Sequence, residues 1–258
     1  MLFRQLIPMV NGSEQAAGGI RPAQEVVIEV QSNVKPPHAI VLQMAHSQLT
    51  GQLAQALRTK LFGKIPADVV EAARQHDFGW IESDADQLEH LEEQRPKPYS
   101  LVPDEVEISS WRNSLRRTEK AAPLISILIS RHFCFLSKDN PPHQEFLQQE
   151  TRRRERIESS FGFSADDLSR WTAAVGFCDL LSLYLGCGST EDAEFPLSHP
   201  ADPAAAHAPK VILSWKDGAP AFTPSVLEPN RFGVEIQEYS GVGTELLERR
   251  VEWNFLNG

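Results

Sequence analysis

Apolar residues recur at a helical period through much of the chain. Between Ala39 and Phe62 they return every three or four positions, which predicts an amphipathic helix that Gly63 ends. Proline suits the first turn of a helix, so we expect a second helix from Pro66 to about Gln75. A further helical stretch begins at about Ser109 and stops at Pro123.

Three more helices are predicted in the middle of the chain. Residues Leu124–Leu136 are apolar almost all round, which is typical of a buried helix. The proline pair 141–142 then starts another helix, which continues through a charged run. Ser164 and Asp167 resemble a capping box. They predict the start of a helix that runs from about Ala165 to Leu185.

Strands are predicted at both ends of the chain. Leu2–Val10 and Glu25–Val30 carry alternating or β-branched residues. Near the other end, three segments separated by turns have the same character: Val211–Trp215, Phe232–Tyr239 and Leu246–Phe255. The strands from both ends can pair into one sheet beside the helices.

Two stretches lack such periodicity. Ile81–Pro103 is acidic, polar and interrupted by prolines, which predicts a long loop, and Gly186–Pro209 is rich in small residues and proline. The expected fold is therefore mainly α, a helical bundle with β segments from both termini forming a small accessory sheet. We divide the chain into an N-terminal β segment (1–37), a helical core (38–187), a connector (188–209) and a C-terminal β segment packed on the core (210–258).

Composition narrows the class of protein. The chain has 258 residues, of which 41% are hydrophobic, with 13 Phe and 5 Trp, so it can bury a substantial core. Its formal net charge of −10 argues against binding a nucleic-acid polymer, which needs a basic surface. A phosphorylated small molecule remains compatible, because a bound cation can reverse the local charge.

Cysteine usage and hydropathy suggest where the protein works. The three cysteines do not have the spacing of a zinc ribbon, and we interpret them as free thiols: Cys134, Cys178 and Cys187. The N-terminus has too short an apolar stretch for a signal peptide, and no apolar run approaches the ~20 residues of a membrane span. We therefore expect a cytoplasmic protein without membrane contact.

The doublet His76-Asp77 is the most informative polar feature. Consecutive residues are about 100° apart on a helix, so both can face one ion most easily near a helix end. Gly79 supplies such an end. His46 lies on the same face of its predicted helix as Leu49, so its ring can point inward.

Two more polar groups lie in the predicted apolar helices. His132 is near the end of one, and Asp179 lies within the apolar run 178–185. A buried carboxylate must be paired, protonated or metal-bound, because a lone buried charge is very costly. Each residue alone has a structural explanation, but together five residues predict a metal site: His46, His76, Asp77, His132 and Asp179.

The order His, His-Asp, His, Asp is similar to that of the HD-domain superfamily of helical metal-dependent phosphohydrolases. The resemblance implies an HD-domain-like core in which His46, the doublet and Asp179 hold a divalent metal. The added His132 looks like the extended pattern of two-metal members. These members include cyclic-dinucleotide phosphodiesterases and diiron oxygenases typified by inositol oxygenase.

A narrower resemblance covers about residues 38–240. Four segments look like an uncharacterised bacterial family, domain of unknown function 3891: His46–Ala54, His76–Trp80, Ser130–His132 and Cys178–Leu183. That family carries no settled activity. The resemblance therefore strengthens the predicted site more than any particular function.

The number of ions stays open. Two-metal HD enzymes usually bring six protein ligands, whereas this chain has five candidates. His90 and His143 lie in polar stretches and are more typical of solvated surface residues, and Glu150 is a further carboxylate candidate. Alternatively one ion is bound and His132 serves as an acid or a substrate contact. The mixed nitrogen and oxygen ligands favour Mn, Fe, Ni or Zn, as one ion or two.

The function we expect is metal-assisted hydrolysis of a phosphorylated small molecule or a nucleotide. In it, the catalytic candidates are His132, which can protonate a leaving oxygen, and Arg131, which can bind a phosphate. Arginines in Arg152–Arg154 are a second phosphate candidate, although a solvated helix face explains them more simply, and Trp80 is interpreted as core. Two alternatives remain, a diiron oxygenase-like redox enzyme and a non-catalytic metal- or ligand-binding module.

Other catalytic signatures are absent from the sequence. It has no glycine-rich dinucleotide or phosphate loop, no nucleophile elbow and no CysXXCys pair. Cys187 follows the end of a helix, where the dipole disfavours a thiolate, so we do not interpret it as a nucleophile. The C-terminal β region either covers the helical core or mediates a homodimer, and the sequence does not distinguish the two.

Overall fold

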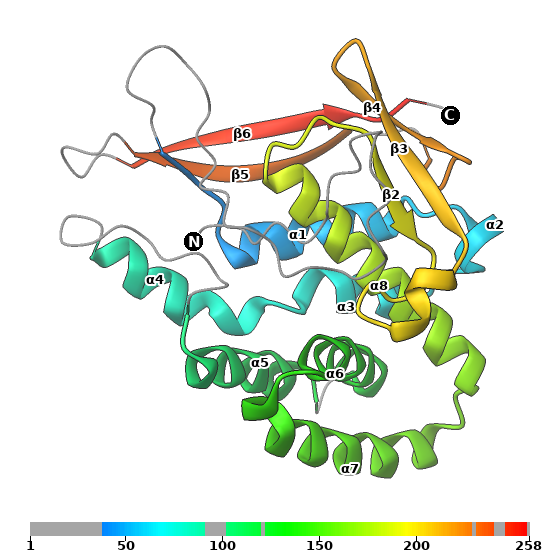
Figure 1. Ribbon diagram of the computed structural model, residues 1–258. Coiled ribbons are helices and arrows are strands. Elements are labelled where there is room, and N and C mark those ends of the chain that lie inside the picture. Colours follow the sequence, from blue (N-terminus) through cyan, green and yellow to red (C-terminus); the bar gives the residue numbers. More distant parts are fainter. Residues whose placement is uncertain (1–37, 91–101, 120–121, 229–230, 240–245, 257–258) are drawn as a thin grey trace.

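Helices make up most of the protein, as the apolar periodicity predicts. The computed structural model describes residues 38–90, 102–119, 122–228, 231–239 and 246–256. These residues form a mainly helical fold with two small antiparallel sheets (Figure 1), which confirms the predicted fold class. The predicted strands 2–10 and 25–30 lie outside the described residues.

The elements follow one another in a helical block and then a strand block. The helices, with 3-10 helices marked η, are α1 (Gln43–Gln55), α2 (Thr59–Phe62), α3 (Ala67–Gln75), η1 (Phe78–Trp80), α4 (Ile81–Glu89), α5 (Asp104–Thr118), α6 (Pro123–Ser137), η3 (Pro141–His143), α7 (Gln144–Phe161), α8 (Ala165–Gly186) and η4 (Pro203–His207). The strands are β1 (His38–Ile40), β2 (Ala193–Pro196), β3 (Lys210–Lys216), β4 (Ala219–Thr223), β5 (Arg231–Tyr239) and β6 (Leu246–Asn254).

The strands form two three-stranded sheets. One has the order β1-β5-β6 and the other β2-β3-β4, and all pairs are antiparallel. β1 precedes the helices in the chain and pairs with β5, so segments from both sides of the helical block share a sheet. β1 is none of the predicted N-terminal strands, and the strands form two sheets rather than the single predicted one. Figure 1 shows the sheets on one side of the molecule, α5, α6 and α7 on the other, and α1, α3 and α8 between them.

The first predicted helix, 39–62, is wrong at its start and is interrupted in its middle, although its predicted end is confirmed, because α2 stops at Phe62 and Gly63 follows. Residues before α1 pair as β1, and α1 stops at Gln55. Beyond it the backbone pairs with the segment before β5: the Arg58 amide donates to the Val226 carbonyl (2.9 Å) and the Glu228 amide to the Ala56 carbonyl (2.8 Å). The periodicity shows which residues are buried, but not that a strand-like segment interrupts the helix.

The predicted loop 81–103 is wrong in its first part. Residues Ile81–Glu89 form α4, which directs Ile81, Asp84 and Leu88 away from solvent at helical spacing. This short inward face was visible in the sequence but was outweighed by the many acidic residues around it. α5 begins at Asp104 rather than at about Ser109, with three acidic residues in its first turn, where the helix dipole favours negative charge.

The two predicted buried helices are confirmed. α6 spans Pro123–Ser137, and α8 begins after Ser164, whose hydroxyl accepts a hydrogen bond from the Asp167 amide (3.0 Å). Every residue from 172 to 185 is buried. Asp179 therefore lies in the middle of a helix that is surrounded by protein.

The strand block is also largely as predicted. The three predicted C-terminal strands appear as β3, β5 and β6, while β4 was not foreseen. The stretch 188–209 contains β2 and η4, so it is partly regular structure. The Gln52 side chain of α1 joins the helices to the sheet by donating to the Gly233 carbonyl (3.0 Å) and accepting from the Gly233 amide (3.2 Å).

Gly79 allows a close approach between η1 and α5. A Cβ atom at this position would lie 1.9 Å from the Ser110 carbonyl oxygen and 2.5 Å from the Ser114 nitrogen. The Gly79 amide also donates to Ser114 Oγ (2.8 Å). Its main role is therefore to let α5 pack against the turn that carries the doublet, and α3 has already ended before it.

Candidate metal centre

All five sequence-predicted ligands converge in the interior. His46 lies on α1, His76 and Asp77 follow α3, His132 lies on α6, and Asp179 lies on α8. Their ligand atoms fall into two overlapping groups that could each hold an ion, His46-His76-Asp77 and His76-His132-Asp179. Within each group the atoms lie within 4.8 Å of one another. Helices far apart in the sequence therefore build one cluster.

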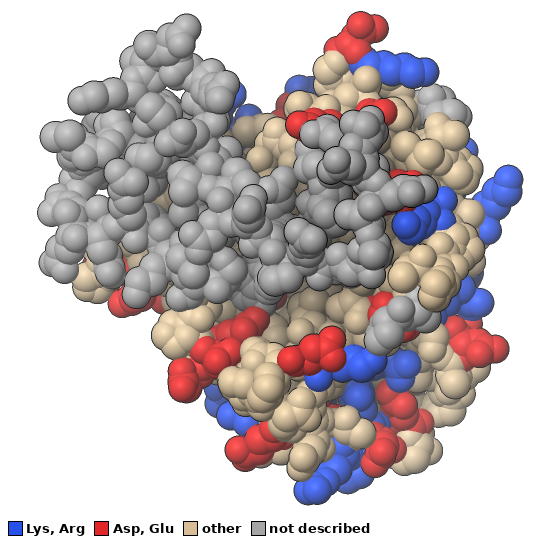
Figure 2. Space-filling view, in the orientation of Figure 1, with Lys and Arg blue, Asp and Glu red and all other residues tan. Residues whose placement is uncertain are grey.

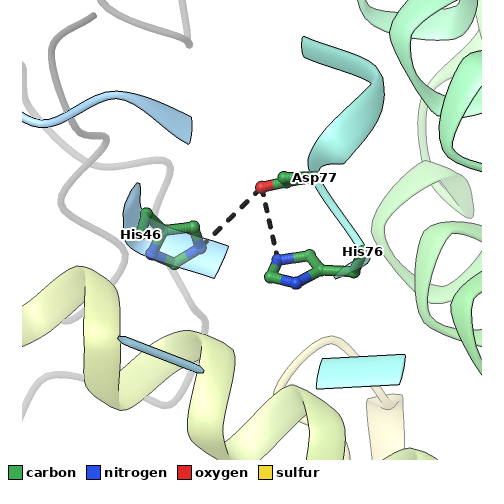
Figure 3. Close-up of side chains that lie close together, drawn as sticks. All are labelled: His46, His76 and Asp77. Carbon is green, nitrogen blue, oxygen red and sulfur yellow. Dashed lines mark ion pairs between the residues drawn. The ribbon is translucent and has the colours of Figure 1, made fainter. Parts of the chain in front are cut away.

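The doublet faces the cluster because the helix ends there. His76 still has helical dihedral angles (φ −56°, ψ −38°), whereas Asp77 departs from them (φ −103°, ψ 14°). This change of direction lets both side chains point the same way, as expected for a doublet near a helix end. Asp77 Oδ2 lies 3.2 Å from His76 Nε2 and 3.8 Å from His46 Nε2 (Figure 3).

Asp179 is the second carboxylate of the cluster. Its Oδ1 lies 2.8 Å from His46 Nε2 and 3.2 Å from His76 Nε2. Its Oδ2 lies 3.6 Å from His132 Nε2. The three imidazole rings thus present their Nε2 atoms to carboxylate oxygens.

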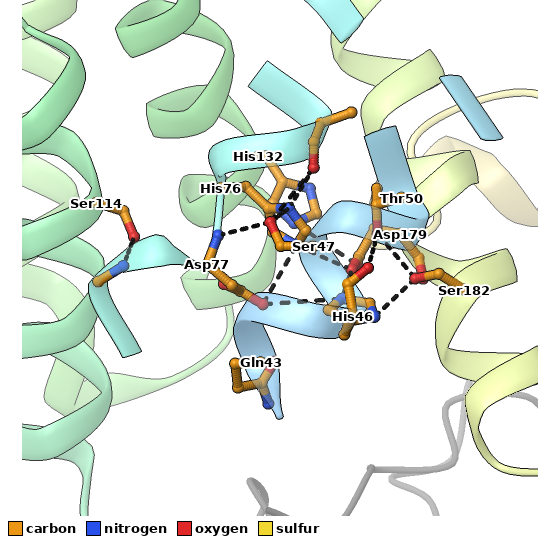
Figure 4. Close-up of polar contacts among 12 residues, drawn as sticks. Gln43, His46, Ser47, Thr50, His76, Asp77, Ser114, His132, Asp179 and Ser182 are labelled. Atoms are coloured by element: carbon orange, nitrogen blue, oxygen red, sulfur yellow. Dashed lines mark hydrogen bonds and ion pairs between the residues drawn. The ribbon is translucent and has the colours of Figure 1, made fainter. Parts of the chain in front are cut away.

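The far side of the His76 ring is held by the backbone. His76 Nδ1 donates to the Ala73 carbonyl (2.8 Å) and lies 3.0 Å from Ser47 Oγ. Ser47 itself donates to the Arg74 carbonyl (2.8 Å) and accepts from the Asp77 amide (3.3 Å), so one buried serine of α1 anchors both doublet residues (Figure 4). Since a carbonyl can only accept, the proton of a neutral His76 must be on Nδ1.

His46 is oriented in the same way. Ser182 Oγ donates to the Asp179 carbonyl (2.9 Å), and its oxygen lies 2.7 Å from His46 Nδ1 (Figure 4). The serine oxygen can therefore accept the Nδ1 proton of His46. A nearby Thr50 lies 2.8 Å from Ser182 Oγ and donates to the His46 carbonyl (3.0 Å), which fixes the serine in place.

The protonation of the cluster reflects its burial. Burial alone would raise the pKa of the Asp179 carboxyl, but hydrogen bonds from His46 and His76 hold that pKa well below its usual range. Burial likewise lowers the pKa of His76, but the charge of Asp77 and hydrogen bonds to both carboxylates raise it well above the ordinary value. The two carboxylates therefore stabilise positive charge at the cluster.

A divalent cation can supply this positive charge. Metal-ligating histidines normally present one ring nitrogen to the ion and donate the other N–H to a protein oxygen. With an ion bound, His46 and His76 would have this arrangement: each would keep its proton on Nδ1, beside a protein oxygen, and would present Nε2 to the ion between the two carboxylates. Nitrogen and carboxylate ligands together suit Mn, Fe, Ni or Zn.

His199 is a member of the cluster that sequence reasoning missed. Its side chain is buried, and its Nε2 lies 2.8 Å from His132 Nδ1, on the side of the His132 ring that faces away from Asp179. Burial lowers the pKa of His132 to about 4 and that of His199 well below its usual value. His199 lies in the stretch interpreted as a connector, where no periodicity indicates an inward side chain.

Arg131 does not reach the cluster through any of its hydrogen bonds. It donates to Thr172 Oγ1 (3.2 Å) and to Glu158 of α7 (3.3 Å). Of the arginines in 152–154, Arg153 forms an ion pair with Glu150 (2.8 Å) and Arg154 donates to the Ser130 carbonyl (3.1 Å). Arg131 and Arg154 thus connect α6 with α7, whereas the Arg153–Glu150 pair lies within α7.

None of the proposed sixth ligands joins the cluster. Glu150 accepts from Ser130 (2.7 Å), and His90 lies 3.6 Å from the Asp86 carboxylate on the same helix. The interpretation of His143 as a solvated residue is wrong, because its side chain is only 2% exposed. It lies in a separate group with Asp104 and Glu107.

The remaining sequence interpretations concern core residues. Trp80, which follows the doublet, is completely buried and belongs to the core as expected. The three cysteines are free. Burial raises the pKa of the Cys187 thiol to about 12, which agrees with its rejection as a nucleophile.

Residues 32–240 match the family described as protein of unknown function (DUF3891). The chain belongs to this family. All five residues of the cluster lie within the part of this DUF3891 protein that the match covers. Neither the curated proteins nor the solved structures contain a match.

The DUF3891 chain can also be described by the hydropathy of its helices and by the charge on one face. Among the described residues, no helix is both long and apolar enough to cross a membrane. Figure 2 shows Lys and Arg side chains interspersed with Asp and Glu on the coloured part of one face, so that part presents no continuous basic surface.

Proposed function

We propose that this protein is a divalent-metal-dependent phosphohydrolase of a small phosphorylated molecule or a nucleotide. The observation that carries the proposal is the paired orientation of His46 and His76. Each ring has a protein oxygen at Nδ1 and directs Nε2 at the carboxylates of Asp77 and Asp179. In this proposal the four residues bind the ion, within an HD-domain-like arrangement of the helical core.

A divalent ion at the cluster would suit a phosphorylated substrate. A divalent ion bound there would make a water molecule more acidic and would neutralise negative charge on a phosphate. The protein's own residues orient the ligands: Ser47 and Ser182 hold the two rings, and α6 brings His132 beside Asp179. Arg131 has no part in this proposal, because its guanidinium bonds to Glu158 and Thr172.

Metal content is the first test. Protein purified without a chelator is expected to contain at least one equivalent of Mn, Fe, Ni or Zn by elemental analysis. Asp77→Ala should lose most of it, whereas Asp86→Ala, the same substitution at an exposed position of α4, should retain it. Wild-type protein without stoichiometric metal would count decisively against the proposal.

Activity is the second test. Phosphate release from a panel of nucleotides and phosphoesters should be abolished by Asp77→Ala and unaffected by Asp86→Ala. Activity that survives Asp77→Ala would refute the site assignment. A metal-loaded protein that releases no phosphate, but shows visible absorption from oxidised iron, would instead favour the diiron oxygenase-like alternative.

A further inference from the structure

The position of His199 is shaped for an imidazole ring. The ring stacks on Phe135, with 4.4 Å between centroids and 16° between planes. On another side lies Gly176 of α8, where a Cβ atom would come within 2.5 Å of His199 Cδ2. A glycine in the middle of a buried helix thus leaves the space that this ring occupies, and the ring is only 3% exposed.

Hydrogen-bond direction fixes which nitrogen of His199 carries the proton. The Ala201 amide donates to His199 Nδ1 (3.2 Å), so this nitrogen must be unprotonated. The proton of the ring is then on Nε2, which lies 2.8 Å from His132 Nδ1. His199 therefore donates to His132 through Nε2.

The same reasoning then fixes His132. Because its Nδ1 accepts from His199, its own proton is on Nε2. This Nε2 is buried, lies 3.6 Å from Asp179 Oδ2, and has no hydrogen-bond partner within the described part of the chain. A nitrogen that carries a proton has no lone pair for a metal. His132 thus has the opposite arrangement to His46 and His76, whose Nδ1 atoms lie against protein oxygens that can accept a proton, so that Nε2 is the atom each would offer to an ion.

We propose that His199 is a positioning residue that holds His132 as a hydrogen-bond donor to the substrate and prevents it from acting as a metal ligand. The ion is then bound by His46, His76, Asp77 and Asp179 alone. The unpartnered Nε2–H of His132 is available to a phosphate oxygen beside the ion. The substrate part of this inference rests on the proposed function, whereas the direction of the hydrogen bonds does not.

The direction of the hydrogen bond between His199 and His132 can be measured without any ligand. Long-range proton–nitrogen correlation spectra of histidine-labelled, metal-free, full-length protein distinguish the two ring tautomers, with His132→Gln identifying the His132 signals. We expect His132 to carry its proton on Nε2 and His76 to carry one on Nδ1. A His132 ring protonated on Nδ1 would overturn the inference, whatever the activity of the protein.

Metal binding provides the second measurement. In titrations of Mn²⁺ into the chelator-treated protein, His46→Gln should weaken binding at least about 100-fold, whereas His132→Gln and His199→Leu should change it less than about threefold. Equal losses in His46→Gln and His132→Gln would show that His132 is a ligand. Weak Mn²⁺ binding by the wild type, together with the expected tautomers, would instead refute the proposed function alone.

Phosphate binding tests the donor role. Inorganic phosphate should bind the Mn²⁺-loaded protein about tenfold more weakly after His132→Leu or His199→Leu. His199→Gln keeps an N–H donor near the position of Nε2, so it should restore binding to within about threefold of the wild type. If Leu and Gln at position 199 bind phosphate equally, His199 only fills space and the inference is wrong.

Discussion

Buried histidines face carboxylates in two separate groups of this protein, and the surroundings of the two groups differ. In the central cluster, His76 faces Asp77 and Asp179, whose side chains are only 12% and 9% exposed. In the second group, the Nε2 of His143 lies 3.0 Å from Asp104 and 3.5 Å from Glu107, whose side chains are 43% and 16% exposed. The two groups are similar in their residue types and in the distances between their atoms.

The surroundings of the carboxylates distinguish the groups. Asp104 and Glu107 lie in the first turn of α5, where the helix dipole already stabilises negative charge, and the Asn140 amide donates to Asp104 (3.0 Å). Asp77 and Asp179 instead share a buried centre with three imidazole rings. Asp77 and Asp179 are therefore buried negative charges that need a positive partner, whereas Asp104 and Glu107 are stabilised by the helix terminus and by solvent.

The largest expected difference between the two groups is in Mn²⁺ affinity after one carboxylate of each is removed. Asp179→Asn is expected to weaken Mn²⁺ binding at least about 100-fold, because it removes the carboxylate charge that faces His46, His76 and His132. Asp104→Asn is the matched change in the second group and should leave Mn²⁺ affinity within about twofold. Calorimetric titration measures both, and similar losses in the two variants would remove the distinction.

Gly79 links the doublet to the helix that carries the second group. Gly79→Ala should lower the free energy of unfolding by about 2–3 kcal/mol, since a Cβ has no room beside the Ser110 carbonyl. Gly162→Ala is the control: nothing lies within 4 Å of that position, and only its positive φ of 65° opposes alanine, at a cost of about 1 kcal/mol. Urea denaturation that ranks the two equally would contradict the close packing.

Asp84 is a third buried carboxylate, and it shows what burial does to the pKa of an acidic side chain. Asp84 accepts a hydrogen bond from the Gln43 amide (2.7 Å), and burial raises its pKa from 3.8 to about 6. Its contribution to stability is therefore complete below pH 3.8 and is lost as pH rises through about 6. Asp84→Asn keeps an acceptor for Gln43 but cannot ionise.

The consequence appears in the pH dependence of unfolding. Between about pH 4 and pH 6, the wild-type stability should contain a slope of up to about −1.4 kcal/mol per pH unit that Asp84→Asn lacks. Urea denaturation at several pH values gives this difference directly. Parallel curves for the two proteins would show that Asp84 ionises in the fold as easily as in the unfolded chain.

The smallest effect is expected at His143. His143→Gln should lower the free energy of unfolding by about 1 kcal/mol, through the loss of partly screened contacts with Asp104 and Glu107. Metal content measured by elemental analysis should not change. A loss of metal comparable to that of Asp77→Ala would mean that the second group also binds an ion.

Local sequence patterns predicted much of this fold. The apolar run that becomes α8 and the cap at Ser164 depend on neighbouring residues, so both could be recognised in advance. The interruption of α1 after Gln55 could not, because the backbone there pairs with residues around Val226, far away in the sequence. Helix α4 was missed because its inward face is short and rests on one buried carboxylate, Asp84.

The residues of the candidate site can be recognised from sequence patterns. His46, the doublet and Asp179 stand out because a polar group in an apolar helical run must find a partner once it is buried. Their spacing also suggested that the doublet works at a helix end, where the change in backbone direction at Asp77 aligns it with His76.

The way in which these residues face one another depends on the packing of the helices. The fold directed Arg131 toward Glu158, placed His143 in a separate group and brought His199 against His132. The physical reason is that periodicity records which side of a helix is buried, but not what lies opposite. The nitrogen on which each histidine holds its proton depends on a partner such as Ser182 or Ala201, which only folding supplies.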